Sequence, residues 1–180
     1  MSEEQLITAM RFASSNPLEQ RKQDDLGRFG LGLKTASLSQ GRCLTVLTSN
    51  GLKCSGANWD QDDCKDWEMR LFDENEVKKK FTFKQDTSQT EVILSNLVRL
   101  TENGSIDLNV WNTLINEARN EIQLIFHRYI EGAEKNLNKL NIYFNDTLIE
   151  PHNPFHSKHP ACEELPTTSV THKKNGLNAR

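Results

Sequence analysis

The sequence predicts an α/β fold, a two-layer sandwich in which a mostly antiparallel mixed sheet carries helices on one face. Two observations lead to this class. Segments with apolar residues at helical spacing occur along the chain together with short segments rich in β-branched residues. A strong hairpin turn, Asn50-Gly51, joins two of these β-branched segments. With 180 residues the chain is long enough to bury a core without disulfide staples.

Composition excludes several classes of protein. The 22 Lys and Arg residues against 25 Asp and Glu give a net charge of −3, which argues against a nucleic-acid binder driven by a global basic field. No apolar run reaches the length of a membrane span, and the acidic N-terminal residues are unlike a secretory signal. The 4 cysteines lie far apart with no C-x-x-C pair, so we expect reduced thiols in a cytoplasmic protein.

The first half of the chain begins with a helix and continues into a hairpin. Ser2 and Gln5 fit a capping box, and apolar residues at helical spacing then predict an amphipathic helix over residues 3–14. Asn16-Pro17 ends it, because the residue before proline avoids the helical region. The charged segment 74–80 is ambiguous. After a glycine-dense stretch and a short helix, strands are expected at residues 43–49, 52–59, 67–72 and 81–83.

The second half combines a buried strand, a long helix and a small hairpin. Residues 90–94 predict the strand, and Asp107 is expected to cap a helix over residues 108–134 with an apolar stripe. Strands at 140–144 and 147–149 flank the turn Asn145-Asp146. From Pro151 onward we expect little regular structure, with disorder after about residue 166.

Three glycines before the short helix, at positions 27, 30 and 32, are the most informative residues. Glycines let the backbone adopt positive φ and approach a ligand without a Cβ in the way. Ahead of a helix they aim free amides at an anion, and Arg28 and Lys34 add positive charge. Neither the Walker A nor the Rossmann spacing fits. Taken alone, the stretch is therefore either a phosphate cradle or a tight loop packed against a sheet.

The wider string LGRFGLGLKTAS, residues 26–37, resembles the glycine-rich lid of the GHKL ATPase superfamily, which includes gyrase, the heat-shock chaperone, histidine kinases and MutL. It resembles in particular the branch with MORC proteins and related bacterial ATP-binding proteins. Residues 41–48 are similar to the strand after the lid helix, and Thr90 to a threonine that supports the nucleotide site. Residues 142–155 resemble the closing hairpin and P-x-D-P-F loop, with Asn153 in place of the usual Asp.

The resemblance implies an ATP-binding domain whose lid wraps the phosphates of ATP or ADP, with Mg²⁺ as the second cofactor. In the family an Mg²⁺-binding Asn, a catalytic acid and an adenine-binding Asp precede the lid, and these would fall upstream of Met1. We therefore expect no catalytic residue and no hydrolysis by this chain alone. The cofactor contacts that the resemblance implies are Gly27, Arg28, Phe29, Gly30, Leu31, Gly32, Leu33, Lys34 and Thr90.

The implied domain organisation is a partial one. Residues 1–155 are expected to form a GHKL-like ATP-binding domain that lacks its first helix and adenine-binding turn, and residues 156–180 a polar tail. Such a chain is a truncated product, a mis-started reading frame, or a split protein completed by a partner chain. A homodimer stays open as another arrangement. Two other functions stay open: a non-catalytic remnant acting through protein contacts, and a DNA-associated module, since MORC and MutL relatives act on DNA.

Other residue patterns give weaker indications of a function. Lys78-Lys79-Lys80 near Phe81 and Phe83 mixes basic and aromatic residues as nucleic-acid surfaces do, but a solvated helix end is favoured. Prolines separate the zinc-competent side chains His152, His156, His159 and Cys162, so we expect no metal site there. The aspartates Asp60, Asp62, Asp63 and Asp66 lack EF-hand spacing and indicate a surface loop. His127 is expected to be a partly buried packing residue.

Overall fold

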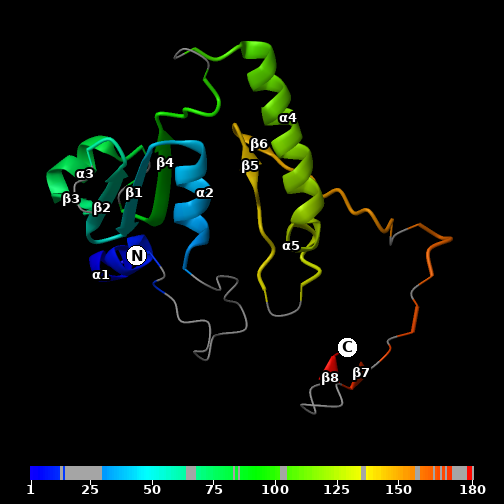
Figure 1. The fold of residues 1–180 in the computed structure, drawn as a ribbon. Coiled ribbons are helices and arrows are strands. Elements are labelled where there is room, and N and C mark those ends of the chain that lie inside the picture. The colour runs from blue at the N-terminus through cyan, green and yellow to red at the C-terminus, as the bar shows by residue number, and fades with distance from the viewer. Residues whose placement is uncertain are drawn as a thin grey trace. The chain divides into compact units, whose positions relative to one another are not determined.

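A computed structural model describes residues 1–12, 14, 30–63, 68–82, 84, 86–101, 105–134, 137–156, 159–163, 165–166, 168, 170–171 and 178–179. The chain divides into two compact units, Met1–Asn112 and Thr113–Arg180, and each is described by itself (Figure 1).

A four-stranded antiparallel sheet forms the centre of the first unit. Its strands are β1 (Cys43–Asn50), β2 (Cys54–Asp60), β3 (Arg70–Phe72) and β4 (Ser88–Ser95), in the order β3-β2-β1-β4. The expected turn joins β1 to β2: Gly51 has a φ of +87°, and Asn50 Oδ1 accepts bonds from the amides of Leu52 and Lys53. The hairpin is therefore confirmed, although β2 begins at Cys54 rather than at residue 52.

Helix α1 (Glu3–Met10) packs on one face of this sheet. Its buried Leu6 and Met10 contact an apolar cluster that includes Val46 of β1 and Trp59 of β2, and α2 (Gly32–Gln40) adds Leu38. The expected capping box of Ser2 and Gln5 is confirmed.

The predicted extent of this first helix, residues 3–14, is wrong at its C-terminal end. The helix stops at Met10 because Arg11 has extended backbone angles (φ −69°, ψ 139°). Side chains from α2 and β2 bind the carbonyls at this end of the helix, so tertiary contacts take the place of a further turn.

Helix α3 (Glu74–Lys80) lies on the opposite face, as Figure 1 shows. Alternate residues of a strand point to opposite faces, so Leu47 of β1 points away from Val46 and packs with Val77 and Phe81. The α/β class with an antiparallel sheet is confirmed, and α3 adds a helix on the second face, where none was expected. Phe81 ends this helix instead of joining an edge strand, and Phe83 lies outside the described residues.

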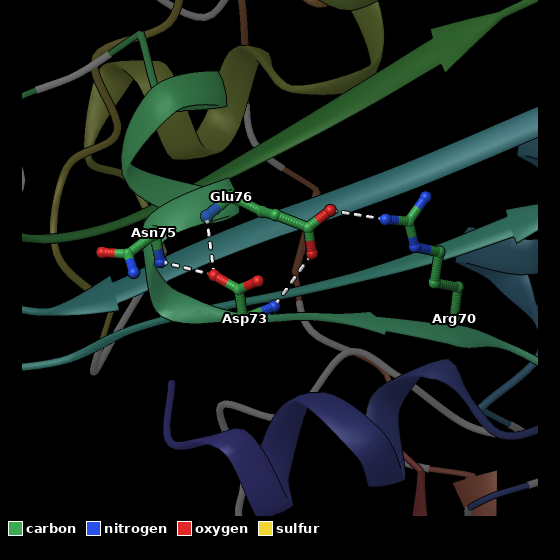
Figure 2. Close-up of polar contacts among 4 residues, drawn as sticks. All are labelled: Arg70, Asp73, Asn75 and Glu76. Atoms are coloured by element: carbon green, nitrogen blue, oxygen red, sulfur yellow. Dashed lines mark hydrogen bonds and ion pairs between the residues drawn. The ribbon is translucent and has the colours of Figure 1, made fainter.

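A capping box explains why the charged segment 74–80 is helical. Figure 2 shows the Asp73 carboxylate accepting bonds from the amides of Asn75 and Glu76 (2.8 and 3.0 Å), while the Glu76 carboxylate accepts from the amide of Asp73 at 3.1 Å. Glu76 also forms an ion pair with Arg70 of β3. The cap therefore fixes both the start of α3 and its position beside β3.

The second unit contains most of α4 (Leu108–Ile125), followed by α5 (His127–Glu131). The predicted cap is confirmed, since Asp107 Oδ1 accepts from the amides of Asn109 and Val110. The single helix expected over residues 108–134 is wrong: it divides at Phe126 and ends at Gly132, whose φ is +73°.

Short hairpins complete the second unit. β5 (Tyr143–Phe144) and β6 (Thr147–Leu148) flank Asn145 and Asp146, whose positive φ values suit a tight turn, so this hairpin is confirmed in shortened form. A further two-residue pair, β7 (Val170–Thr171) and β8 (Asn178–Ala179), occurs where no regular structure was expected.

Candidate functional site

The start of α2 is an uncapped helix terminus preceded by a left-handed glycine. Gly30 has a φ of +60°, and Leu31 at the cap position provides no side-chain hydrogen bond. The first bond of the helix runs from Thr35 N to Leu31 O (2.9 Å), so the amides before Thr35 have no acceptor within the helix. Among the described residues, a Cβ placed on Gly32 would meet nothing within 4 Å. Three residues of the expected lid, Gly27, Arg28 and Phe29, lie outside the described residues.

Helix starts of this kind can attract an anion. Backbone amides without an intrahelical acceptor and the positive end of the helix dipole both favour negative charge. The first turn of α2 contains no acidic residue that would compete with a bound anion. The open space at Gly32 leaves room for such a group next to the backbone. Leu33, beside it, is partly exposed.

Lys34 lies in the first turn of α2 but points away from solvent. Its side chain is only 1% exposed, and its ammonium donates to the carbonyl oxygens of Ala9 (2.6 Å) and Arg11 (2.8 Å) at the end of α1. Burial lowers the pKa of the Lys34 ammonium from its ordinary value. The Lys34 ammonium, which was expected to contact a phosphate, is therefore bonded to the C-terminal end of α1 in this structure.

Trp59 of β2 completes the contacts at this end of α1. Its indole Nε1 donates to Met10 O at 3.1 Å, and its ring packs edge-on against Phe12 with centroids 5.5 Å apart. Three successive carbonyls, those of the last two residues of α1 and of Arg11 after it, thus accept bonds from side chains of other elements. No local pattern could reveal these contacts, because the partners lie 23 to 49 residues apart in the sequence.

Thr90, the remaining residue expected to contact the nucleotide, lies in β4 of the sheet and not at the start of α2. It pairs with Thr48 across β1 and β4, and their hydroxyl oxygens are 3.0 Å apart. Thr48 is fully buried and accepts a bond from the nitrogen of Met1 at 2.9 Å. The exposed Thr90 is therefore oriented by a buried partner that the sequence did not single out. The sequence offered one indication of this partner, because Thr48 lies in the segment 43–49 that was expected to form a strand.

The two places are connected through α1 rather than directly. Thr48, the partner of Thr90, is bonded to the nitrogen of Met1 just before α1 begins, and Lys34 is bonded to the other end of the helix. A hollow of about 340 Å³ lies beside the start of α1 and the β1–β2 turn. Its lining contains none of the residues expected to contact the nucleotide: it comprises Met1, Ser2, Glu3, Glu4, Asn50, Lys53 and Ser55.

The loop that resembles the family's closing motif is bonded to α5. Asn153 Nδ2 donates to a carboxylate oxygen of Glu131 (3.2 Å), and its Oδ1 accepts from the amide of Phe155 (2.9 Å). The Phe155 ring packs against His127, with ring centroids 6.1 Å apart. His127 is buried, which confirms its expected packing role. Asn153 therefore uses both sides of its amide to hold the loop.

Asn153→Asp, which introduces the residue that the resemblance to the closing loop leads us to expect, should lower the free energy of unfolding by about 1–3 kcal/mol at pH 7. The new carboxylate would face that of Glu131, so a hydrogen bond is replaced by repulsion. The repulsion needs two ionised carboxylates, so the loss is present at pH 7 and disappears at about pH 3, where carboxylic acids are mostly protonated. Urea unfolding at both pH values measures it.

The double variant Asn153→Asp with Glu131→Gln is the control, because the glutamine amide can donate to the new carboxylate. We expect it to recover most of the lost stability at pH 7. If Asn153→Asp alone is as stable as the natural sequence at pH 7, the described bond to Glu131 does not hold the loop.

The basic stretch forms the last turn of α3, which confirms the solvated helix end. Lys78 is paired with Glu74 at 2.7 Å, and the Lys80 ammonium lies 5.4 Å from the centre of the Phe72 ring. Phe81 is turned into the core. Lys78 and Lys80 thus have protein partners, and the aromatic residue beside them is not available to a nucleic-acid base.

The metal-competent residues form no cluster in the described part of the chain, where no group of three or more His, Cys, Asp or Glu is placed to hold a metal ion. Cys162 Sγ lies 3.5 Å from Phe155 O. In the acidic loop, Asp62 pairs with Arg42 at 2.6 Å, and this hydrogen bond lowers the pKa of the Asp62 carboxyl. Asp66 lies outside the described residues.

Comparison with protein families identifies the chain. The family model of histidine kinase-, DNA gyrase B- and HSP90-like ATPases matches residues 1–90, half of the sequence. The chain belongs to this ATPase family. The match covers α1, the glycine-rich stretch, α2, β1 to β3 and α3, and ends at Thr90 in β4. A search among curated proteins finds none that matches. In the described parts of the chain, no helix is long and apolar enough to span a membrane.

Proposed function

We propose that the chain binds ATP through its glycine-rich lid. In this proposal residues 27–33 wrap the phosphates, and the free amides at the start of α2 bind the phosphate oxygens. The observation that carries it is the uncapped start of α2 beside the open space at Gly32. Arg28 adds positive charge, while Thr90, held by Thr48, supports the nucleotide from the sheet.

We assign Mg²⁺ to the bound nucleotide rather than to a protein cluster. When bound, the ion would neutralise charge on the phosphate oxygens. The described residues offer no group of carboxylates for it, so we name no metal ligand and no catalytic residue in this chain. The proposed function is nucleotide binding without hydrolysis by this chain alone, with a partner chain completing the site. A homodimer is the alternative partner arrangement.

Two finer assignments belong to the same proposal. The likeness of residues 142–155 to the closing hairpin and loop supports a place near the MORC branch, and residues 1–155 would then be the ATP-binding domain. Free thiols at Cys43, Cys54 and Cys162 support a cytoplasmic location.

Thermal unfolding of the full chain with ATP, ADP or adenosine tests the binding. A ligand at a hundred times its dissociation constant stabilises the folded state by about 2.7 kcal/mol. Since the proposed contacts are to phosphates, we expect the stabilisation to fall in the order ATP, ADP, adenosine. Equal stabilisation by all three, or none by ATP, would contradict the phosphate site at α2.

Phosphate release tests the second part of the proposal. The purified 180-residue chain with ATP and Mg²⁺ is expected to release phosphate at the rate of a protein-free control. Among the described residues, no group of three or more His, Cys, Asp or Glu is placed to hold the metal. Sustained turnover that requires Mg²⁺ and is lost in Gly30→Val would show that this chain is a complete catalyst. Gly30→Val serves here because valine is strained at the left-handed φ of that residue.

A further inference from the structure

We infer that Lys34 is a positioning residue that clamps together the two ends of the glycine-rich segment. Its ammonium ties the start of α2, which follows the segment, to the end of α1, which precedes it. This role differs from the phosphate contact expected from the sequence, and it needs no nucleotide.

The position of the contact in the chain is the first argument. Residues 12–31 connect the end of α1 to α2 and contain the whole lid string up to Leu31. Lys34 bonds residues 9 and 11, so one side chain joins both ends of this connection at its base. Bringing two distant points of a chain together costs conformational entropy, and a contact between them opposes their separation.

The chemistry of the end of α1 is the second argument. The last carbonyls of a helix lack intrahelical partners and carry partial negative charge, which a cation stabilises. The last turn of α1 contains no basic residue. Lys34 supplies the cation from another helix, at 2.6 and 2.8 Å, the short distances typical of charge-assisted hydrogen bonds.

Burial is the third argument. Only 1% of the Lys34 side chain is exposed, so few water molecules can reach the ammonium and replace these two hydrogen bonds. A buried ammonium that lost both carbonyls would be strongly destabilised. The Lys34 ammonium therefore stays bonded to the end of α1. This bond also holds the backbone of α2 at Lys34, two residues after Gly32.

One consequence rests on the proposed function. Backbone amides bind a phosphate only if the helix terminus that carries them is held in place. Lys34 would thus influence nucleotide affinity through the position of Gly32 and its neighbours, without touching the ligand.

The test is Lys34→Met in the full chain, without nucleotide. Methionine keeps an unbranched apolar side chain and removes the ammonium. Hydrogen exchange at the end of α1 and the start of α2 is expected to become about tenfold faster or more, with exchange in α3 unchanged. Trypsin should cleave faster after Arg21, Lys22 and Arg28, which lie in the connecting segment.

Lys53→Met is the matched control. Lys53 also binds α1, but through Glu3 at the opposite end and with more than half of its side chain exposed. We expect no change in exchange at the start of α2 in this variant. If both variants behave alike, loss of any lysine bonded to α1 has the same effect and the clamp is refuted.

A second measurement uses the natural sequence and so does not depend on the variant folding. Acetylation of lysines, followed by mass spectrometry, is expected to modify Lys34 at least tenfold more slowly than Lys53, because the Lys34 amine is buried and bonded. Modification of both at similar rates would overturn the inference.

The outcomes also separate the clamp from the proposed function. If Lys34→Met leaves exchange unchanged and removes only the stabilisation by ATP, Lys34 is a phosphate ligand and the clamp is wrong. If exchange and trypsin cleavage respond as expected but ATP does not stabilise the natural sequence, the clamp holds and the proposed function fails.

Discussion

Replacing Gly32 by alanine is expected to weaken ATP binding at least tenfold, which is about 1.4 kcal/mol, without loss of stability in the free protein. Gly32 is the first residue of α2, and a methyl group there meets none of the described residues within 4 Å. Alanine favours helix by up to about 1 kcal/mol over glycine, so the free protein should become slightly more stable. The methyl group would occupy the space proposed for phosphate. ATP titration by calorimetry and urea unfolding measure the two effects.

Two other variants serve as controls for Gly32→Ala, one that should keep ATP binding and one that should lose it. Thr35→Ala, one turn further along α2 and outside the proposed contacts, should bind ATP like the natural sequence. Gly30→Val should lower both stability and binding, because its left-handed φ of +60° strains any side chain. If Gly32→Ala binds ATP with unchanged affinity, phosphate does not lie against the start of α2.

Replacing Leu47 by alanine is expected to cost about 2–5 kcal/mol of unfolding free energy, the usual range for a buried leucine. Leu47 is fully buried in the central strand and packs in the cluster with Cys54, Val77 and Phe81. Truncation would leave a cavity between the sheet and α3. Urea unfolding followed by tryptophan fluorescence measures the loss.

Leu52→Ala is the control, since Leu52 lies in the adjacent turn with 95% of its surface exposed. Exposed substitutions of this kind change stability by about 0.5 kcal/mol or less. A similar small effect for Leu47→Ala would show that α3 does not pack on the second face of the sheet.

The elements that the sequence predicted well have local causes. The Asn50-Gly51 turn, the Ser2 capping box and the Asp107 cap each depend on residues within a few positions of one another, so they can be recognised without knowing the fold. The same kind of box at Asp73 and Glu76 was available but was obscured by the charged composition of segment 74–80.

The features that the sequence did not predict depend on distant partners. Helix α1 ends early because Lys34 and Trp59, far along the chain, bind its last carbonyls. Thr90 could be predicted from its resemblance to a family position, but its partner Thr48 follows only from the register of two strands. The glycine string indicated the candidate site, whereas the direction of the Lys34 side chain required the fold.

Helix α1 can be viewed as a short rigid rod held at both ends. Its 8 residues span about 12 Å. The nitrogen of Met1 bonds to Thr48 at one end, and Lys34 holds the carbonyls at the other. If a rod fixed in this way shifts as a whole, a displacement of the sheet near Thr90 would reach the base of the glycine-rich segment. Under the proposed function, the two groups of residues that we propose for the nucleotide would then move together.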